Sequence, residues 1–84
     1  MQLRRDDLVV RHLDGEVVML CLATSTYFSA NASGSLLVDL LGEEHDEQDL
    51  AVRLADEVGI PLIRAQSDVR AFVGQLRAHG LLVD

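Results

Sequence analysis

The chain is short of most residues from which catalytic and metal sites are built. Its 84 residues include one cysteine, one proline, no tryptophan and no lysine, since all seven basic residues are Arg. The single thiol, Cys21, cannot form an internal disulfide, and its place in the run VVMLCL predicts a small buried side chain. His12, His45 and His79 lack any zinc spacing, so we expect no metal and no cofactor.

Long apolar runs and positive charge are also scarce. No run approaches the roughly 18 residues that a membrane span requires, and charged residues follow Met1 where a signal peptide would be apolar. We therefore expect a cytoplasmic protein without a membrane partner. Fourteen acidic residues give a net charge of -7, which repels a phosphate backbone and disfavours nucleic acid as a partner. The length predicts a single domain over residues 1–84.

The first third of the chain has the pattern of β-strands. LVVRHL at 8–13 and EVVMLCL at 16–22 predict two strands, and the Asp14-Gly15 pair between them predicts a hairpin with a type I′ turn. Apolar residues occupy both alternating faces of the second strand, which predicts a central strand covered on both sides. The polar ATST at 23–26 then leads into a short third strand at about 27–30.

Two helices are predicted directly behind these strands. Asn31 is a good N-cap for the first helix, which Gly42 ends. Asp46 is a good N-cap for the second helix, which Gly59 ends.

A third helix is predicted to begin near Pro61, which favours a first-turn position, and to run to about residue 79. Its apolar stripe comprises Ala65, Val69, Phe72 and Leu76. The order of three strands and three helices predicts an α+β domain in which helices pack on one side of a three-stranded antiparallel sheet.

The two outer strands of such a sheet leave rows of unpaired backbone donors and acceptors. Proteins usually blunt these edges with Lys, Pro, a bulge or a covering element. The third strand has no charged residue and no proline, and Tyr27 and Phe28 lie there instead. This edge is typical of one that is available to a guest strand.

The same residues resemble a known family. DG, VVMLCL, YFSANASG, LLVDLL and, after a polar gap, LAVRLADEVGI and SDVRAFVGQLRAHGLL are similar to the PqqD-like recognition elements of ribosomally made, modified peptides (RiPPs). The likeness covers residues 8–83 and is greatest to the stand-alone proteins of lasso peptide biosynthesis. It implies a winged helix-turn-helix-like domain, not an enzyme, that binds the leader of a precursor peptide. The implied further partners are a leader protease and a cyclase.

In that family the leader adds as an antiparallel strand beside the third strand and lies against the third helix. Carried onto this sequence, the resemblance implies peptide-binding residues on the strand, namely Thr26, Tyr27, Phe28, Ser29 and Ala30. On the helix it implies Val69, Arg70, Phe72, Val73, Leu76 and Arg77. Ala30 departs from the family pattern, which usually has a larger aliphatic residue there.

The flank of the third helix that meets the guest is not determined by the sequence. Val73, Arg70 and Arg77 lie on one side of the apolar stripe, and Asp68, Gln75 and His79 lie on the other. We favour the Val73 flank, because it adds apolar area and because two Arg side chains can pair with leader carboxylates or carbonyls.

Two other functions are compatible with the pattern. A winged-helix DNA-binding regulator shares the element order, but its recognition helix should be basic. A dimerisation domain would pair the open edge with its own copy. Catalysis has no support, because Ser29, Ser33 and Ser35 lack a GxSxG context and Gly34 alone is no phosphate loop.

Overall fold

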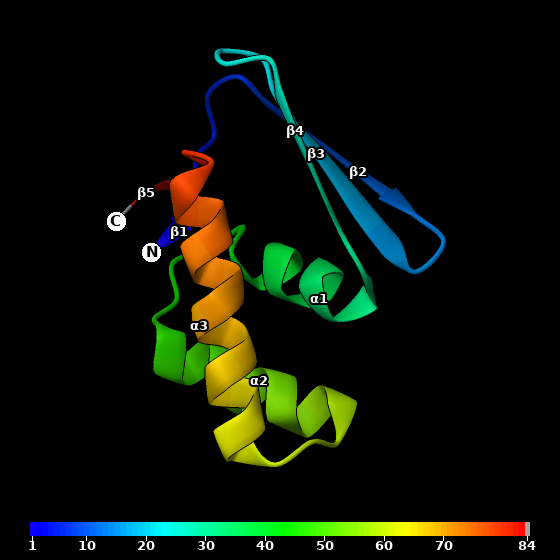
Figure 1. Ribbon diagram of the computed structural model, residues 1–84, viewed down its shortest axis with the longest axis vertical. Coiled ribbons are helices and arrows are strands. Elements are labelled where there is room, and N and C mark those ends of the chain that lie inside the picture. Colours follow the sequence, from blue (N-terminus) through cyan, green and yellow to red (C-terminus); the bar gives the residue numbers. More distant parts are fainter. Residues whose placement is uncertain (84) are drawn as a thin grey trace.

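Three strands followed by three helices form the frame of the molecule, which the computed structural model describes over residues 1–83 (Figure 1). The elements are β1 (Gln2–Leu3), β2 (Leu8–Leu13), β3 (Glu16–Cys21), β4 (Thr26–Ala30), α1 (Ala32–Leu40), α2 (Glu47–Val58), α3 (Leu62–Ala78) and β5 (Leu82–Val83). The predicted α+β class is confirmed, with the addition of the two short terminal strands β1 and β5.

β3 is the middle strand of an antiparallel sheet with the order β2-β3-β4. Val17, Met19 and Cys21 are fully buried on the face that α1 covers, so the predicted central strand and the buried cysteine are both confirmed. The expectation of cover on both faces was wrong, because Leu20 is 37% and Leu22 54% exposed. No element within residues 1–83 packs against that second face, which we call the outer face (Figure 1).

The turn between β2 and β3 differs in detail from the prediction. Leu13 pairs with Glu16, so the hairpin has the expected position and register. A type I′ turn requires positive φ at both loop residues, but only Gly15 has one, at +69°, and Asp14 does not. The predicted turn type was therefore wrong.

Side-chain caps begin the first two helices where they were predicted. Asn31 Oδ1 accepts a hydrogen bond from the Gly34 N–H at 3.1 Å, and Asp46 Oδ1 accepts one from the Asp49 N–H at 2.7 Å. Each bond satisfies a backbone donor that the first helical turn leaves unpaired. α2 ends at Gly59, whose φ of +75° is the left-handed conformation that glycine adopts without strain.

The two ends of the chain lie together. Gln2 pairs with Val83 and Leu3 with Leu82 to form a separate two-stranded antiparallel sheet (Figure 1). The Leu3 N–H also donates to the Leu41 carbonyl at 2.8 Å, which attaches β1 to the end of α1. Strands of two residues are too short for their periodicity to be recognised in a sequence.

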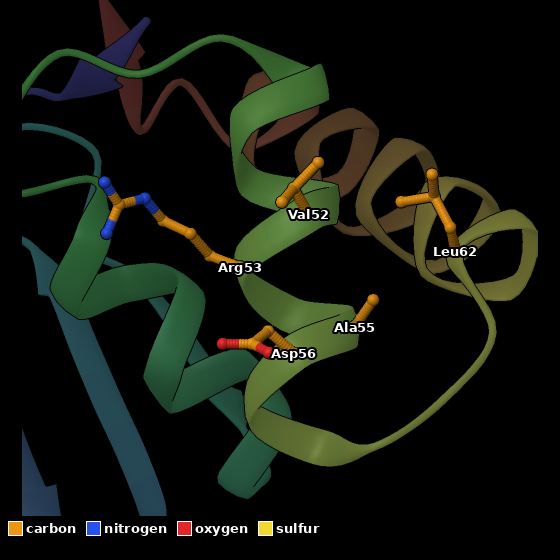
Figure 2. A pocket seen from close by; sticks show the side chains of 5 residues that line it. All are labelled: Val52, Arg53, Ala55, Asp56 and Leu62. Atoms are coloured by element: carbon orange, nitrogen blue, oxygen red, sulfur yellow. The ribbon is translucent and has the colours of Figure 1, made fainter.

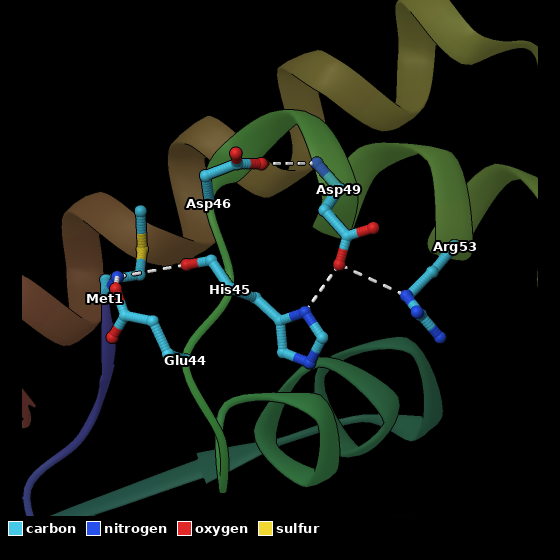
Figure 3. Close-up of polar contacts among 6 residues, drawn as sticks. All are labelled: Met1, Glu44, His45, Asp46, Asp49 and Arg53. Atoms are coloured by element: carbon cyan, nitrogen blue, oxygen red, sulfur yellow. Dashed lines mark hydrogen bonds and ion pairs between the residues drawn. The ribbon is translucent and has the colours of Figure 1, made fainter.

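Polar contacts fix the segment between α1 and α2 (Figure 3). The terminal amine of Met1 pairs with Glu44 and donates to the His45 carbonyl at 3.0 Å. The His45 ring is hydrogen-bonded to Asp49, which also forms an ion pair with Arg53 at 3.1 Å. The hydrogen bond from His45, together with the Arg53 charge, holds the pKa of Asp49 below its usual value. These contacts attach the start of α2 to the N-terminus of the chain.

The core fills the space between the sheet and the helices. Its members from the helices and the α1 C-cap are Leu37, Val38, Leu41, Leu50, Ala51, Leu54, Ala65, Val69, Val73 and Leu76. None of the helices in residues 1–83 combines the length and the apolar character needed to cross a membrane.

Candidate peptide-binding site

β4 has one free edge. It pairs with β3 on one side, and no strand within residues 1–83 pairs with its other side. The C-terminal segment could have filled this position, but β5 pairs with β1 instead. Along β4, Tyr27 and Ser29 are exposed on the outer face, whereas Phe28 and Ala30 are half-buried on the helical side.

Aromatic rings connect the helical side of β4 to α3. The Phe28 and Phe72 ring centroids lie 5.9 Å apart at 69°, and the Phe28 and His79 centroids lie 5.2 Å apart at 72°. Both are edge-to-face arrangements, which aromatic rings favour. The His79 Nδ1–H donates to the Gln75 carbonyl at 2.7 Å, because a carbonyl oxygen can only accept. That bond orients the imidazole and leaves Nε2 without a hydrogen bond to residues 1–83.

We call this region the β4–α3 seam. It comprises Thr26–Ala30 of β4, Asp68 and Phe72 of α3, and His79, which caps the end of α3. At the Ala30 end the surface is hollowed into a cavity of about 310 Å³. The cavity is lined by Asn31, Ser33, Gly34, Leu37, Leu54, Arg64, Asp68 and Phe72. It has room for a large side chain at the end of an edge strand.

Gly34 sets how closely α1 approaches the seam. A Cβ atom added at Gly34 would lie 2.5 Å from Ala30 Cβ and 3.0 Å from Phe72 Cε1. Such contacts are shorter than packed carbon atoms tolerate. The small residue at position 30, unusual by the pattern of the resembling family, therefore lies where β4, α1 and the Phe72 ring meet with no space to spare.

The structure separates the predicted site residues into three groups. Thr26–Ala30 and Phe72 lie together at the seam. Val69, Val73 and Leu76 are at most 2% exposed and belong to the core beneath it. Arg70 lines a hollow with Glu47, Gln48 and Gln66 at the start of α2, and Arg77 lies exposed on the same flank of α3.

The preference for the Val73 flank stays a prediction, although the opposite flank of α3 is the one that faces β4. Phe28 contacts Phe72 and His79, and Asp68 shares the cavity with Phe72. Three residues outside the predicted set also lie at the seam or its cavity, namely Asp68, His79 and Gly34. Helical spacing had placed Asp68 and His79 together on one flank, but only the position of β4 shows that this flank faces the strand.

A larger hollow than the cavity at the Ala30 end lies elsewhere, between α2 and the start of α3 (Figure 2). It measures about 430 Å³ and is an open surface depression lined by Val52, Arg53, Ala55, Asp56 and Leu62. Its lining residues belong to α2 and α3, so within the described chain it offers no strand edge for a guest strand to pair with. Within residues 1–83, no group of three His, Cys, Asp or Glu side chains is arranged to hold a metal.

An unpaired edge strand beside a long last helix defines a class of small winged-helix-like binding domains. Residues 16–82 match the family described as Coenzyme PQQ synthesis protein D (PqqD). Since this match spans most of the chain, the chain belongs to the PqqD family, and the predicted family is confirmed.

Two solved structures resemble the chain. In each case the similarity covers 100% of this chain and 100% of the other. "TbiB1 in Complex with the TbiA(beta) Leader Peptide" has 31% sequence identity and a TM-score of 0.85. "Lasso peptide synthetase B1 complexed with the leader peptide" has 26% identity and a TM-score of 0.82. No curated protein sequence matches the chain.

Proposed function

We propose that this protein binds the leader segment of a ribosomally made precursor peptide of the lasso class. The leader adds as an antiparallel strand to β4 and packs against α3. The observation that supports this most directly is the free edge of β4 beside the Phe28, Phe72 and His79 rings. Both similar solved structures are complexes of a relative with a leader peptide.

Backbone pairing alone is too weak for this function. About five backbone hydrogen bonds contribute about 1 kcal/mol each, whereas association costs roughly 4 to 15 kcal/mol. Two or three leader side chains, each stabilised by about 1.5 to 3 kcal/mol on burial, supply the difference. The seam offers such positions on the half-buried rings and in the cavity at the Ala30 end.

The contacts divide between the two elements of the seam. Thr26–Ala30 supply backbone hydrogen bonds, and Phe28, Phe72 and His79 supply the apolar surface. Val69, Val73 and Leu76 support the Phe72 side of α3 from within the core. Arg70 and Arg77 lie on the flank of α3 that is turned away from β4, so this proposal gives them no central contact.

The bound leader is delivered to a separate leader protease, and the released core to a cyclase, within the cytoplasm. The protein itself catalyses no step. Holding the leader raises the effective concentration of the cleavage site near the protease, which increases the rate without any new catalytic group.

The test uses two substitutions at equivalent positions on the two sheet edges. Phe28 and Val10 both pair with Met19, on opposite sides of it. Fluorescence polarisation with a labelled leader of the cognate precursor should give saturable binding. Phe28→Asp should weaken it by about 100-fold, because it removes a ring and places a charge in the seam. Val10→Asp should leave the affinity within about twofold.

Circular dichroism must show that both variants remain folded. Equal loss of affinity in both variants would contradict a site at β4. Absence of saturable binding by the unmodified protein would contradict the function itself.

A further inference from the structure

A segment of four residues joins the end of α3 to the end of β3. Residues 4–7 connect β1 to β2 and run from beside the end of α3 to the sheet (Figure 1). At one end of this segment the Arg4 N–H donates to the Leu81 carbonyl at 2.9 Å, just beyond α3. At its other end the Asp7 carbonyl accepts a hydrogen bond from the Leu22 N–H at 2.7 Å, just beyond β3.

This segment lies at the end of the seam where β4 begins. Cys21, the last residue of β3, pairs with Thr26, the first residue of β4. His79, which caps α3 at the seam, is followed by Gly80, whose carbonyl accepts a hydrogen bond from Arg4 Nη1 at 3.4 Å. The segment is therefore attached beside the seam both to the helix and to the sheet.

Two arginine side chains line a hollow at this place. The hollow measures about 240 Å³, and its lining consists of Arg4, Arg5, Asp6, Gly80, Leu82 and Val83. Arg4 Nε donates to the Asp6 carbonyl at 3.0 Å. The Arg5 side chain is exposed and forms no hydrogen bond or ion pair with another residue of the described chain. The lining thus has two guanidinium groups and one carboxylate, and within residues 1–83 no ion pair joins them.

The direction of the leader follows from antiparallel pairing with β4. Its amino end lies beside Ala30 and its carboxyl end beside Thr26, because β4 runs from Thr26 to Ala30. The leader residues that follow the paired strand therefore emerge toward residues 4–7. A guest strand on β4 is two strand spacings from β3, roughly 10 Å, and an extended chain advances about 3.3 Å per residue. About four residues beyond the paired strand are enough to reach the hollow.

The chemistry of the hollow favours a carboxylate. Guanidinium groups bind carboxylates through paired, charge-assisted hydrogen bonds. A polyanion such as a phosphate backbone is disfavoured, because the whole chain carries a net charge of -7. A single leader carboxylate meets less of this repulsion, and the strand paired at the seam keeps it at high local concentration beside the hollow.

We propose that Arg5, together with Arg4, binds the carboxylate of an Asp or Glu of the leader that lies within about four residues after the strand paired with β4. This inference rests on the proposed leader-binding function and adds a second element to it. The leader is recognised as an apolar strand followed by an acidic residue, in that order along the chain.

The test is a double-mutant cycle between Arg5 and the leader on the full chain. Fluorescence polarisation with the labelled leader should show that Arg5→Glu weakens binding by about 5- to 10-fold, because repulsion replaces attraction. Arg5→Gln, which only removes the charge, should weaken it by about 2- to 4-fold. Each Asp and Glu of the leader is then changed in turn to Asn or Gln. One such change, on the carboxyl side of the paired strand, should bring Arg5→Glu within about twofold of the unmodified protein.

Arg11→Glu is the matched control. Arg11 is exposed on β2, forms no ion pair within residues 1–83, and its substitution changes the net charge by the same amount. This variant should bind the leader within about twofold of the unmodified protein. The difference between Arg5→Glu and the unmodified protein should shrink as NaCl rises from about 0.05 to about 0.5 M. Circular dichroism checks that the variants are folded.

The outcomes separate this inference from the function on which it rests. Saturable leader binding with equal affinities of Arg5→Glu and Arg11→Glu would overturn the inference alone. So would coupling of Arg5 to an acidic residue before the paired strand, or a cognate leader with no Asp or Glu after it. Absence of saturable binding by the unmodified protein would instead overturn leader binding itself, and this inference with it.

Discussion

The two edges of one sheet have unequal surroundings. β2 and β4 both pair with β3, and Met19 lies between Val10 and Phe28. Phe28 contacts two rings of α3, whereas Val10 remains 37% exposed, with no helical ring against it. Unpaired strand edges are common in proteins, but an edge that lies beside apolar side chains, as β4 does, can also bury the side chains of a bound peptide.

Charge accentuates the difference between the edges. β2 carries Arg11 and His12, and charged residues on an edge discourage pairing with other chains. His12 Nε2 also lies 3.1 Å from Asp39 Oδ1, and its Nδ1 lies 3.4 Å from Ser35 Oγ, which ties β2 to α1. β4 has no charged residue, and within residues 1–83 no side-chain hydrogen bond or ion pair connects it to a helix, so its edge stays available.

The first prediction concerns the backbone amides of the leader. Only alternate residues of an edge strand direct their N–H groups toward the neighbouring strand. We expect a leader with two methylated amides facing β4 to bind at least about 30-fold more weakly, since two bonds of about 1 kcal/mol are lost. Competition fluorescence polarisation measures the effect.

The matched control is a leader methylated at the two intervening amides. It should bind within about threefold of the unmodified peptide. Equal affinity for both methylated peptides would show that the leader does not bind through backbone hydrogen bonds to β4. The free edge of β4 would then not be what distinguishes it from β2.

Periodicity and caps in the sequence were sufficient to predict most of this fold. Asn31 and Asp46 act locally, within three residues of their partners, so their roles as helix caps were predictable. The flank of α3 that lies beside β4 was not predictable, because it depends on how elements far apart in the sequence pack together. The exposed Leu20 and Leu22 were misjudged for a related reason: an apolar strand face has the same sequence pattern whether or not a helix covers it.

The second prediction concerns the packing of the Phe72 ring beside β4, which has no counterpart at Val10 of β2 among residues 1–83. Gly34→Ala should lower the free energy of unfolding by about 1 to 3 kcal/mol, because the new methyl group overlaps Ala30 and the Phe72 ring. Displacement of Phe72 should also weaken leader binding. Urea denaturation followed by circular dichroism gives the stability, since the chain has no tryptophan to report it by fluorescence.

Gly74→Ala is the control for this substitution. Gly74 lies within α3, and no atom would contact an added Cβ within 4 Å. This variant should gain about 0.4 to 1 kcal/mol, because alanine has less conformational freedom than glycine in the unfolded chain. Equal effects of the two substitutions would show that the packing at Gly34 is not tight.

The smallest expected effect compares the two histidines that lie near the edges. His79→Ala should weaken leader binding by about 2- to 10-fold, because it removes one ring from the edge-to-face contact with Phe28. His12→Ala should leave the affinity unchanged and cause only a small loss of stability, since its pairing with Asp39 is half exposed to solvent. Equal loss of leader affinity in His12→Ala and His79→Ala would contradict this comparison. It would show that the Phe72 and His79 rings are not the reason why the leader binds at β4 and not at β2.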